Sequence, residues 1–202
     1  MDRNKAVYKL KNFGPVYYLN MDEQPERKIY MEAQFKYWEI ENYTRISAYD
    51  GREDDLSDII KGRYPDHMSS GEVGCTTSHL KAIRHWLDTS DSPYAVIMED
   101  DCSLDLVRYW NFTWSDFYAK VPYDWDVVQI AVICTGDVNL KIHKRFVNEF
   151  STACYIITRH HAEKMMKLHW RGKDKYRLDN GCLLYTSPSP RDATLSRMPS
   201  SA

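Results

Sequence analysis

Apolar and polar positions follow two different periods along this chain. Short apolar runs rich in Val, Ile and Tyr predict strands, at residues 16–20, 44–49, 94–98, 127–133 and 153–158. Segments in which apolar residues recur at helical spacing predict helices, at residues 26–38, 54–61, 70–87, 109–119 and 161–168. The run 127–133 is almost continuously apolar, which is typical of a central strand covered on both faces.

The alternation of strands and helices predicts the fold class. It is typical of an α/β protein with a mostly parallel sheet flanked by helices. The chain of 202 residues is long enough for a domain with a sizeable core, and no internal repeat or linker divides it. We therefore expect a single domain.

The charge balance is close to neutral, with 27 Lys and Arg against 29 Asp and Glu. Nucleic-acid binders carry a basic face, so that class of partner is disfavoured. No apolar run approaches the ~18–20 residues that span a bilayer, and the first residues lack the apolar part of a secretory signal. The five cysteines form no CxxC pair. We expect a cytoplasmic protein with no transmembrane segment.

Three carboxylates follow the apolar run 94–98 directly, at Glu99, Asp100 and Asp101. Like charges a few Å apart repel one another, and a divalent cation removes that cost. Hard ions such as Mg²⁺ and Mn²⁺ prefer oxygen ligands, and ligands of open α/β sheets bind beyond the carboxyl ends of the strands. The triplet predicts a metal-assisted site for a phosphorylated ligand. The alternative is that Asp100 or Asp101 only caps the next helix.

A second ligand pattern lies on the predicted helix 70–87. Cys75 and His79 are one helical turn apart, and His85 follows on the same helix. Together they suggest a zinc site. A fourth ligand is missing, and His85 falls off the face that Cys75 and His79 share, so this interpretation is disfavoured.

Five segments carry, in order, a resemblance to a known family. They read YYLNMD with a following Arg27, ISAYDG at 46–51, GEVGCTTSHL at 71–80, VIMEDD at 96–101, and TACYII at 152–157 before Ala162. These segments resemble the INLDRRxxR, AxDG, GExGCxxSH, LEDD and YxIxxxxA motifs of glycosyltransferase family 25. That family includes lipooligosaccharide galactosyltransferases and collagen hydroxylysine galactosyltransferases. The resemblance covers residues 14 to 180, and we assign 14–181 to a family 25-like domain.

The resemblance implies a GT-A fold, a nucleotide-sugar donor and a divalent metal, Mn²⁺ or Mg²⁺. Glu99 and Asp101 occupy the outer positions of the acidic triplet, and we expect Asp101 to be the direct metal ligand. Glu99 is expected to be a second ligand, or to act on the ribose or through water. Asp100 is a weaker candidate because successive side chains of an extended segment point to opposite faces.

Four residues near the first two predicted strands are expected to bind the donor. The guanidinium of Arg27 suits a phosphate, although a surface charge on a helix is the alternative. Asn20 and Asp50 each end a strand and are expected to contact the base and ribose; otherwise they are turn residues. Gly51 serves the tight turn.

The resemblance also points to residues of the predicted helix 70–87 and to Asp179 after the last predicted helix. Ser78 and His79 are expected at the donor, with His79 on the diphosphate or sugar; a buried core histidine is the alternative. An inverting transfer needs a general base near the acceptor hydroxyl. Glu72 and Asp179 are the two carboxylates we assign as candidates for that role.

The carboxyl-terminal residues resemble sequencing adapters rather than protein. Residues 182–192 back-translate onto a transposase mosaic end, residues 196–202 onto a flow-cell end, and 193–195 span a variable index. We predict adapter read-through after about Gly181 and a missing native carboxyl-terminal part. The alternative is a disordered tail rich in Ser and Pro.

Together these features predict an enzyme that moves a hexose, galactose in particular, from a UDP-sugar to a glycan or lipid-linked saccharide acceptor. Lipopolysaccharide (LPS) or a related surface glycan is the expected destination. A nucleotidyltransferase is one alternative, but residues 20–26 hold no basic glycine-rich loop. A catalytically incomplete sugar-nucleotide-binding domain is the other.

Overall fold

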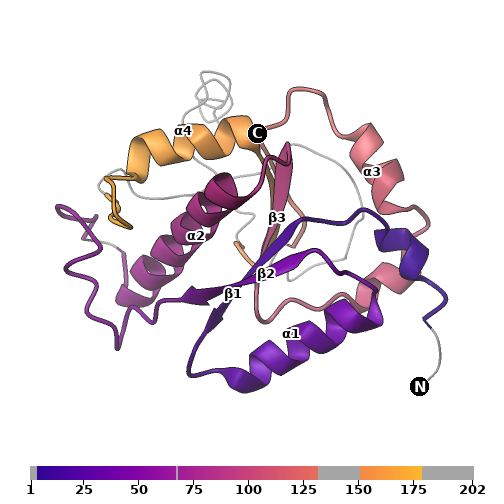
Figure 1. Cartoon of the computed structure of the whole chain (residues 1–202), viewed down its shortest axis with the longest axis horizontal. Coiled ribbons are helices and arrows are strands. Elements are labelled where there is room, and N and C mark those ends of the chain that lie inside the picture. Colours follow the sequence, from indigo (N-terminus) through magenta and orange to yellow (C-terminus); the bar gives the residue numbers. More distant parts are fainter. Residues whose placement is uncertain (1–3, 67, 132–150, 179–202) are drawn as a thin grey trace, which may run out of the picture.

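The computed structural model describes residues 4–66, 68–131 and 151–178 (Figure 1). Its strands are β1 (Val16–Met21), β2 (Tyr43–Ala48), β3 (Tyr94–Glu99), β4 (Val127–Gln129) and β5 (Cys154–Thr158). Its α-helices are α1 (Pro25–Tyr37), α2 (Ser70–Thr89), α3 (Trp114–Lys120) and α4 (Arg159–His169). Two 3₁₀ helices accompany them, η1 (Val7–Leu10) and η2 (Asp105–Tyr109).

The described strands form one sheet in the order β2-β1-β3-β5-β4. β1 is parallel to β2 and β3, whereas β5 is antiparallel to β3 and β4. The predicted α/β class and mostly parallel sheet are confirmed, with β5 as the reversed strand. An apolar run does not encode the direction of its strand, so the reversal could not be predicted from periodicity.

The position of β4 corrects one prediction. The run 127–133 was expected to be a central strand, but β4 spans Val127–Gln129 and has a neighbour only in β5 among the described strands. All three of its residues are half-buried. Residues 132 and 133 lie outside the part of the chain that the structure describes.

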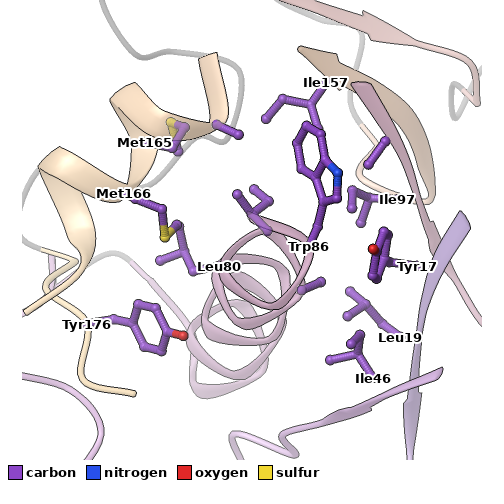
Figure 2. Close-up of a cluster of buried hydrophobic side chains, with 14 of the residues drawn as sticks. Tyr17, Leu19, Ile46, Leu80, Trp86, Ile97, Ile157, Met165, Met166 and Tyr176 are labelled. Carbon is purple, nitrogen blue, oxygen red and sulfur yellow. The ribbon is translucent and has the colours of Figure 1, made fainter. Parts of the chain in front are cut away.

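The sheet separates two hydrophobic clusters. Side chains alternate along each strand, so Tyr17 faces α2 and α4 while its neighbour Tyr18 faces α1. α2 and α4 cover the same face of the sheet, and Figure 2 shows Trp86 and Leu80 of α2 between the strands and α4. Trp86 is fully buried, and its truncation to Ala is expected to cost ~3–5 kcal/mol.

Local signals explain where helices begin. Ser69 accepts a hydrogen bond from the backbone of Glu72, whose carboxylate accepts in return, and this capping box starts α2. Thr113 and Asp116 form a second capping box. The predicted helix 109–119 therefore starts later than expected. Thr113 is a cap residue and is not helical, so α3 begins at Trp114. The predicted helix 54–61 is wrong, since these residues form turns.

Candidate active site

The carboxyl ends of three strands meet at one edge of the sheet. The parallel register pairs Leu19 with Glu99 and Asn20 with Ser47. Asp100 follows Glu99 at the same edge. Because ligands of open α/β sheets bind beyond this edge, the acidic triplet lies where a ligand site is expected.

The alternation of β3 divides the triplet between the two faces of the sheet. Ile97 packs in the cluster that includes α2. Two positions on, Glu99 contacts His79 of α2, whereas Asp100 contacts Arg27 of α1. The three carboxylates therefore do not form a single ligand set.

Asp100 is buried and held by two predicted donor-binding residues. Asn20 Nδ2 donates to its Oδ2 at 2.7 Å, and Arg27 Nη1 donates to its Oδ1 at 2.9 Å. The Asn20 amide also donates to the carbonyl oxygen of Gln24 and accepts from Arg45 Nε. With 1% of its surface exposed, Asn20 stabilises the strand ends here, and its expected contact with the base or ribose stays a prediction.

Asp101 has a different environment. Its side chain is 56% exposed, and Arg27 Nη1 lies 3.8 Å from its Oδ2. Partial burial and the negative charges of Glu99 and Asp100 raise the pKa of Asp101, against the opposing charge of Arg27. A hard cation bound beside Asp101 would neutralise its repulsion with these two carboxylates. Of the three carboxylates, Asp101 has the most exposed side chain, and its oxygens are ligands of the kind that Mg²⁺ and Mn²⁺ prefer.

Glu99 joins a compact cluster with Cys75 and His79. Its Oε1 lies 3.3 Å from His79 Nε2 and accepts a short hydrogen bond from Thr152. The ligating atoms of Cys75, His79 and Glu99 all lie within 4.8 Å of one another, so these three residues could hold a metal ion. Glu99 from another element is thus a third possible ligand beside Cys75 and His79, and the exposed His85 is not part of this cluster.

His79 is fully buried and its second ring nitrogen is also engaged. Nδ1 lies 3.0 Å from the hydroxyl of Tyr155 on β5. Burial alone would lower the pKa of His79, but hydrogen bonds with Cys75 and Glu99 outweigh it and raise the pKa to about 9. The imidazole is thus enclosed by protein groups, and its expected contact with a diphosphate or sugar stays a prediction.

The second motif packs against the start of α2. The hydroxyl of Ser78 donates to the carbonyl oxygen of Gly74 and accepts from the backbone N–H of Tyr49. Asp50 accepts from the backbone N–H of Arg52 and holds the turn at Gly51. Ser78 is buried and its hydroxyl holds this turn, while its expected role at the donor stays a prediction.

Of the two candidate bases, the structure describes Glu72. Glu72 is exposed, and its carboxylate accepts from the backbone N–H and the hydroxyl of Ser69. Asp179 lies outside the described residues, as do Cys134 and the predicted adapter residues 182–202.

Two surface hollows lie away from the acidic edge. One, of about 440 Å³, is lined by residues of η1 and the end of α1, including Tyr8 and Trp38. The other, of about 420 Å³, lies between α2 and α4 and includes Arg84 and Trp170. None of the predicted site residues lines either hollow.

A comparison with known protein families identifies the family to which these motifs belong. The sequence model of glycosyltransferase family 25 (LPS biosynthesis protein) matches residues 13–179. The chain belongs to glycosyltransferase family 25. No curated protein matches the chain. Family membership supports a transferase activity and, by the description of the family, a part in LPS biosynthesis.

Two basic residues of this family 25 protein that no motif marks also reach the acidic edge. Arg45 Nε donates to Asn20 Oδ1 at 2.8 Å, and Lys81 Nζ donates to the carbonyl oxygen of Ser47 at 2.8 Å. Burial lowers the pKa of Lys81. The position of a charged Arg45 inside the strand 44–49 is the one sequence signal that could have marked it.

In the described part of this family 25 protein, no helix combines the length and apolar character needed to cross a membrane.

Proposed function

We propose that this family 25 protein is a metal-dependent hexosyltransferase that moves galactose from a UDP-sugar to a saccharide acceptor in LPS or surface-glycan synthesis. One observation carries the metal dependence: Asp101 has a half-exposed carboxylate and a raised pKa beside two further carboxylates. A group of this kind stabilises a bound hard cation. The GT-A fold belongs to the same proposal.

The residues of the chain would act as follows. Asp101 holds Mn²⁺ or Mg²⁺, with Glu99 as a secondary contact through the oxygen that His79 and Thr152 do not use. When bound, the ion neutralises the negative charge of the leaving diphosphate. Arg27 has a half-exposed guanidinium that donates to the diphosphate with the N–H groups not bound to Asp100.

The acceptor hydroxyl needs a base for an inverting transfer. Glu72 and Asp179 remain our candidates. Glu72 is the carboxylate of the third motif, residues 71–80, and it reaches solvent. Activity of Glu72→Gln and Asp179→Asn proteins with a fixed donor would separate the two.

Calorimetry of UDP binding tests the proposal. We expect binding to the unchanged protein to require Mn²⁺ or Mg²⁺, and Asp101→Asn to weaken it at least about tenfold because the charge that holds the ion is removed. Asp105→Asn is a matched control, since Asp105 is an exposed aspartate that pairs with Arg108 on η2. Tight UDP binding without metal would contradict the role of Asp101.

A screen of UDP-sugars for metal-dependent hydrolysis then tests the donor. We expect UDP-galactose to be hydrolysed fastest, with release of UDP and free sugar. Cleavage between the phosphates in place of the anomeric bond would instead indicate a nucleotidyltransferase.

A further inference from the structure

A cluster of three different ligand types lies beside the proposed donor site. It combines the thiol of Cys75, the imidazole of His79 and the carboxylate of Glu99, from α2 and the end of β3. Cys75 and His79 are one helical turn apart and so share a face of α2. Neither the hard-ion site at Asp101 nor the binding of a donor needs a thiol at this position.

We propose that Cys75, His79 and Glu99 form a zinc site, additional to the hard-ion site at Asp101. Thiolate, imidazole and carboxylate together favour Zn²⁺ over Mg²⁺ or Mn²⁺. Bond lengths of about 2.0–2.3 Å place neighbouring donors of a tetrahedral site roughly 3.3–3.8 Å apart. The 3.3 Å between His79 Nε2 and Glu99 Oε1 agrees with this spacing.

The groups around the cluster support a metal site. Zinc-bound histidines usually have their other ring nitrogen in a hydrogen bond, which fixes the ring. Tyr155 provides that partner at His79 Nδ1, at 3.0 Å. Thr152 holds the Glu99 carboxylate in the same way and lies 3.8 Å from the Cys75 sulfur.

Charge and access also agree. Binding of Zn²⁺ would release the protons of the thiol and of the imidazolium to solvent. The resulting thiolate, carboxylate and neutral imidazole carry two negative charges, which match one Zn²⁺. His79 is fully buried, but the Glu99 side chain is 28% exposed and Cys75 is half-buried, so the ion has a route from solvent. A bound ion would connect the second turn of α2 to the end of β3, next to Asp101.

Zinc titration of the chelator-treated protein tests the site. We expect one Zn²⁺ to bind at the cluster, and Co²⁺ in its place to show a thiolate-to-metal charge-transfer band. Cys75→Ser and Glu99→Gln should each weaken Zn²⁺ binding at least about tenfold, with loss of that band in Cys75→Ser. Thermal unfolding should show stabilisation by Zn²⁺ in the unchanged protein and little in Cys75→Ser.

Cys102→Ser is the matched control. Cys102 is a buried free cysteine outside the cluster whose sulfur contacts the carbonyl oxygen of Ala153. Its replacement should leave Zn²⁺ affinity unchanged, and Asp101→Asn should lose UDP binding but keep Zn²⁺. Equal Zn²⁺ affinity and an unchanged Co²⁺ spectrum in the Cys75→Ser protein would overturn the proposal, as would absence of Zn²⁺ binding in the unchanged protein.

Discussion

Gly51 and Gly74 lie backbone against backbone, where the turn after β2 meets the first turns of α2. A Cβ atom at Gly74 would lie 2.8 Å from the Cα of Gly51 and 2.9 Å from the carbonyl oxygen of Tyr49. A Cβ atom at Gly51 would lie 2.8 Å from the backbone nitrogen of Gly74. Close packing of the main chain therefore explains why both motif positions hold glycine, although they are far apart in the sequence.

We predict that Gly74→Ala destabilises the protein by about 1–3 kcal/mol, because the added methyl group has backbone on both sides and no room to shift. The higher helix propensity of Ala returns at most about 1 kcal/mol. Urea unfolding measures the difference.

Gly71→Ala on the same helix is the control for this substitution. A Cβ atom there would meet only the flexible side chain of Arg52, at 3.7 Å. We expect no loss of stability in Gly71→Ala. A loss as large as that of Gly74→Ala would show that the close approach to Gly51 is not the cause.

Asp100 and Asp101 should respond differently to substitution although they are neighbours. Asp100→Ala removes the acceptor of Asn20 and Arg27 in a buried place, and we expect a loss of about 1–3 kcal/mol. Asp101→Ala should change stability by less than about 0.5 kcal/mol because its side chain is largely exposed. Equal effects in denaturant titrations would argue against the division of the triplet between two faces.

Acid sensitivity offers a test at the end of β1. Hydrogen bonds from Arg45 and Ser47 hold the pKa of Asp22 below its usual range, against a small opposing effect of burial. A carboxyl group with a lowered folded pKa stabilises the protein above its unfolded pKa of about 3.9 and loses this contribution as pH falls through the folded value.

We therefore expect Asp22→Asn to be less stable than the unchanged protein at neutral pH and to lose stability less steeply below about pH 4. Unfolding midpoints measured across pH would show the difference. Glu23→Gln, at the neighbouring exposed position, controls for the change in net charge. Parallel curves for Asp22→Asn and the unchanged protein would rule out this contribution of Asp22.

Periodicity predicted most of the elements because each depends on local spacing. Strands β1, β2, β3 and β5 and helices α1, α2 and α4 lie close to the predicted ranges. The reversal of β5 and the outer position of β4 depend on which strands pair, and an apolar run alone does not contain that information. The turns at 54–61 show the same limit in a segment with few buried residues.

The position of the acidic triplet in the fold could be predicted, but its contacts only in part. The acidic triplet lies at the carboxyl edge of the sheet as expected. The partner of His79, by contrast, is Glu99, twenty positions on and in another element. Spacing within one helix could suggest only His85, because long-range contacts form when α2 packs on β3.

The divided triplet has a consequence for how sequence variation in this segment should be interpreted. Glu99 contacts His79 of α2 in the proposed zinc cluster, Asp100 holds Arg27 of α1, and Asp101 faces solvent at the sheet edge. Replacing all three residues in one variant would combine the loss of three different sets of contacts. Natural exchanges at each position are expected to follow separate rules, with the outermost aspartate constrained by its ligand and the middle one by its neighbours.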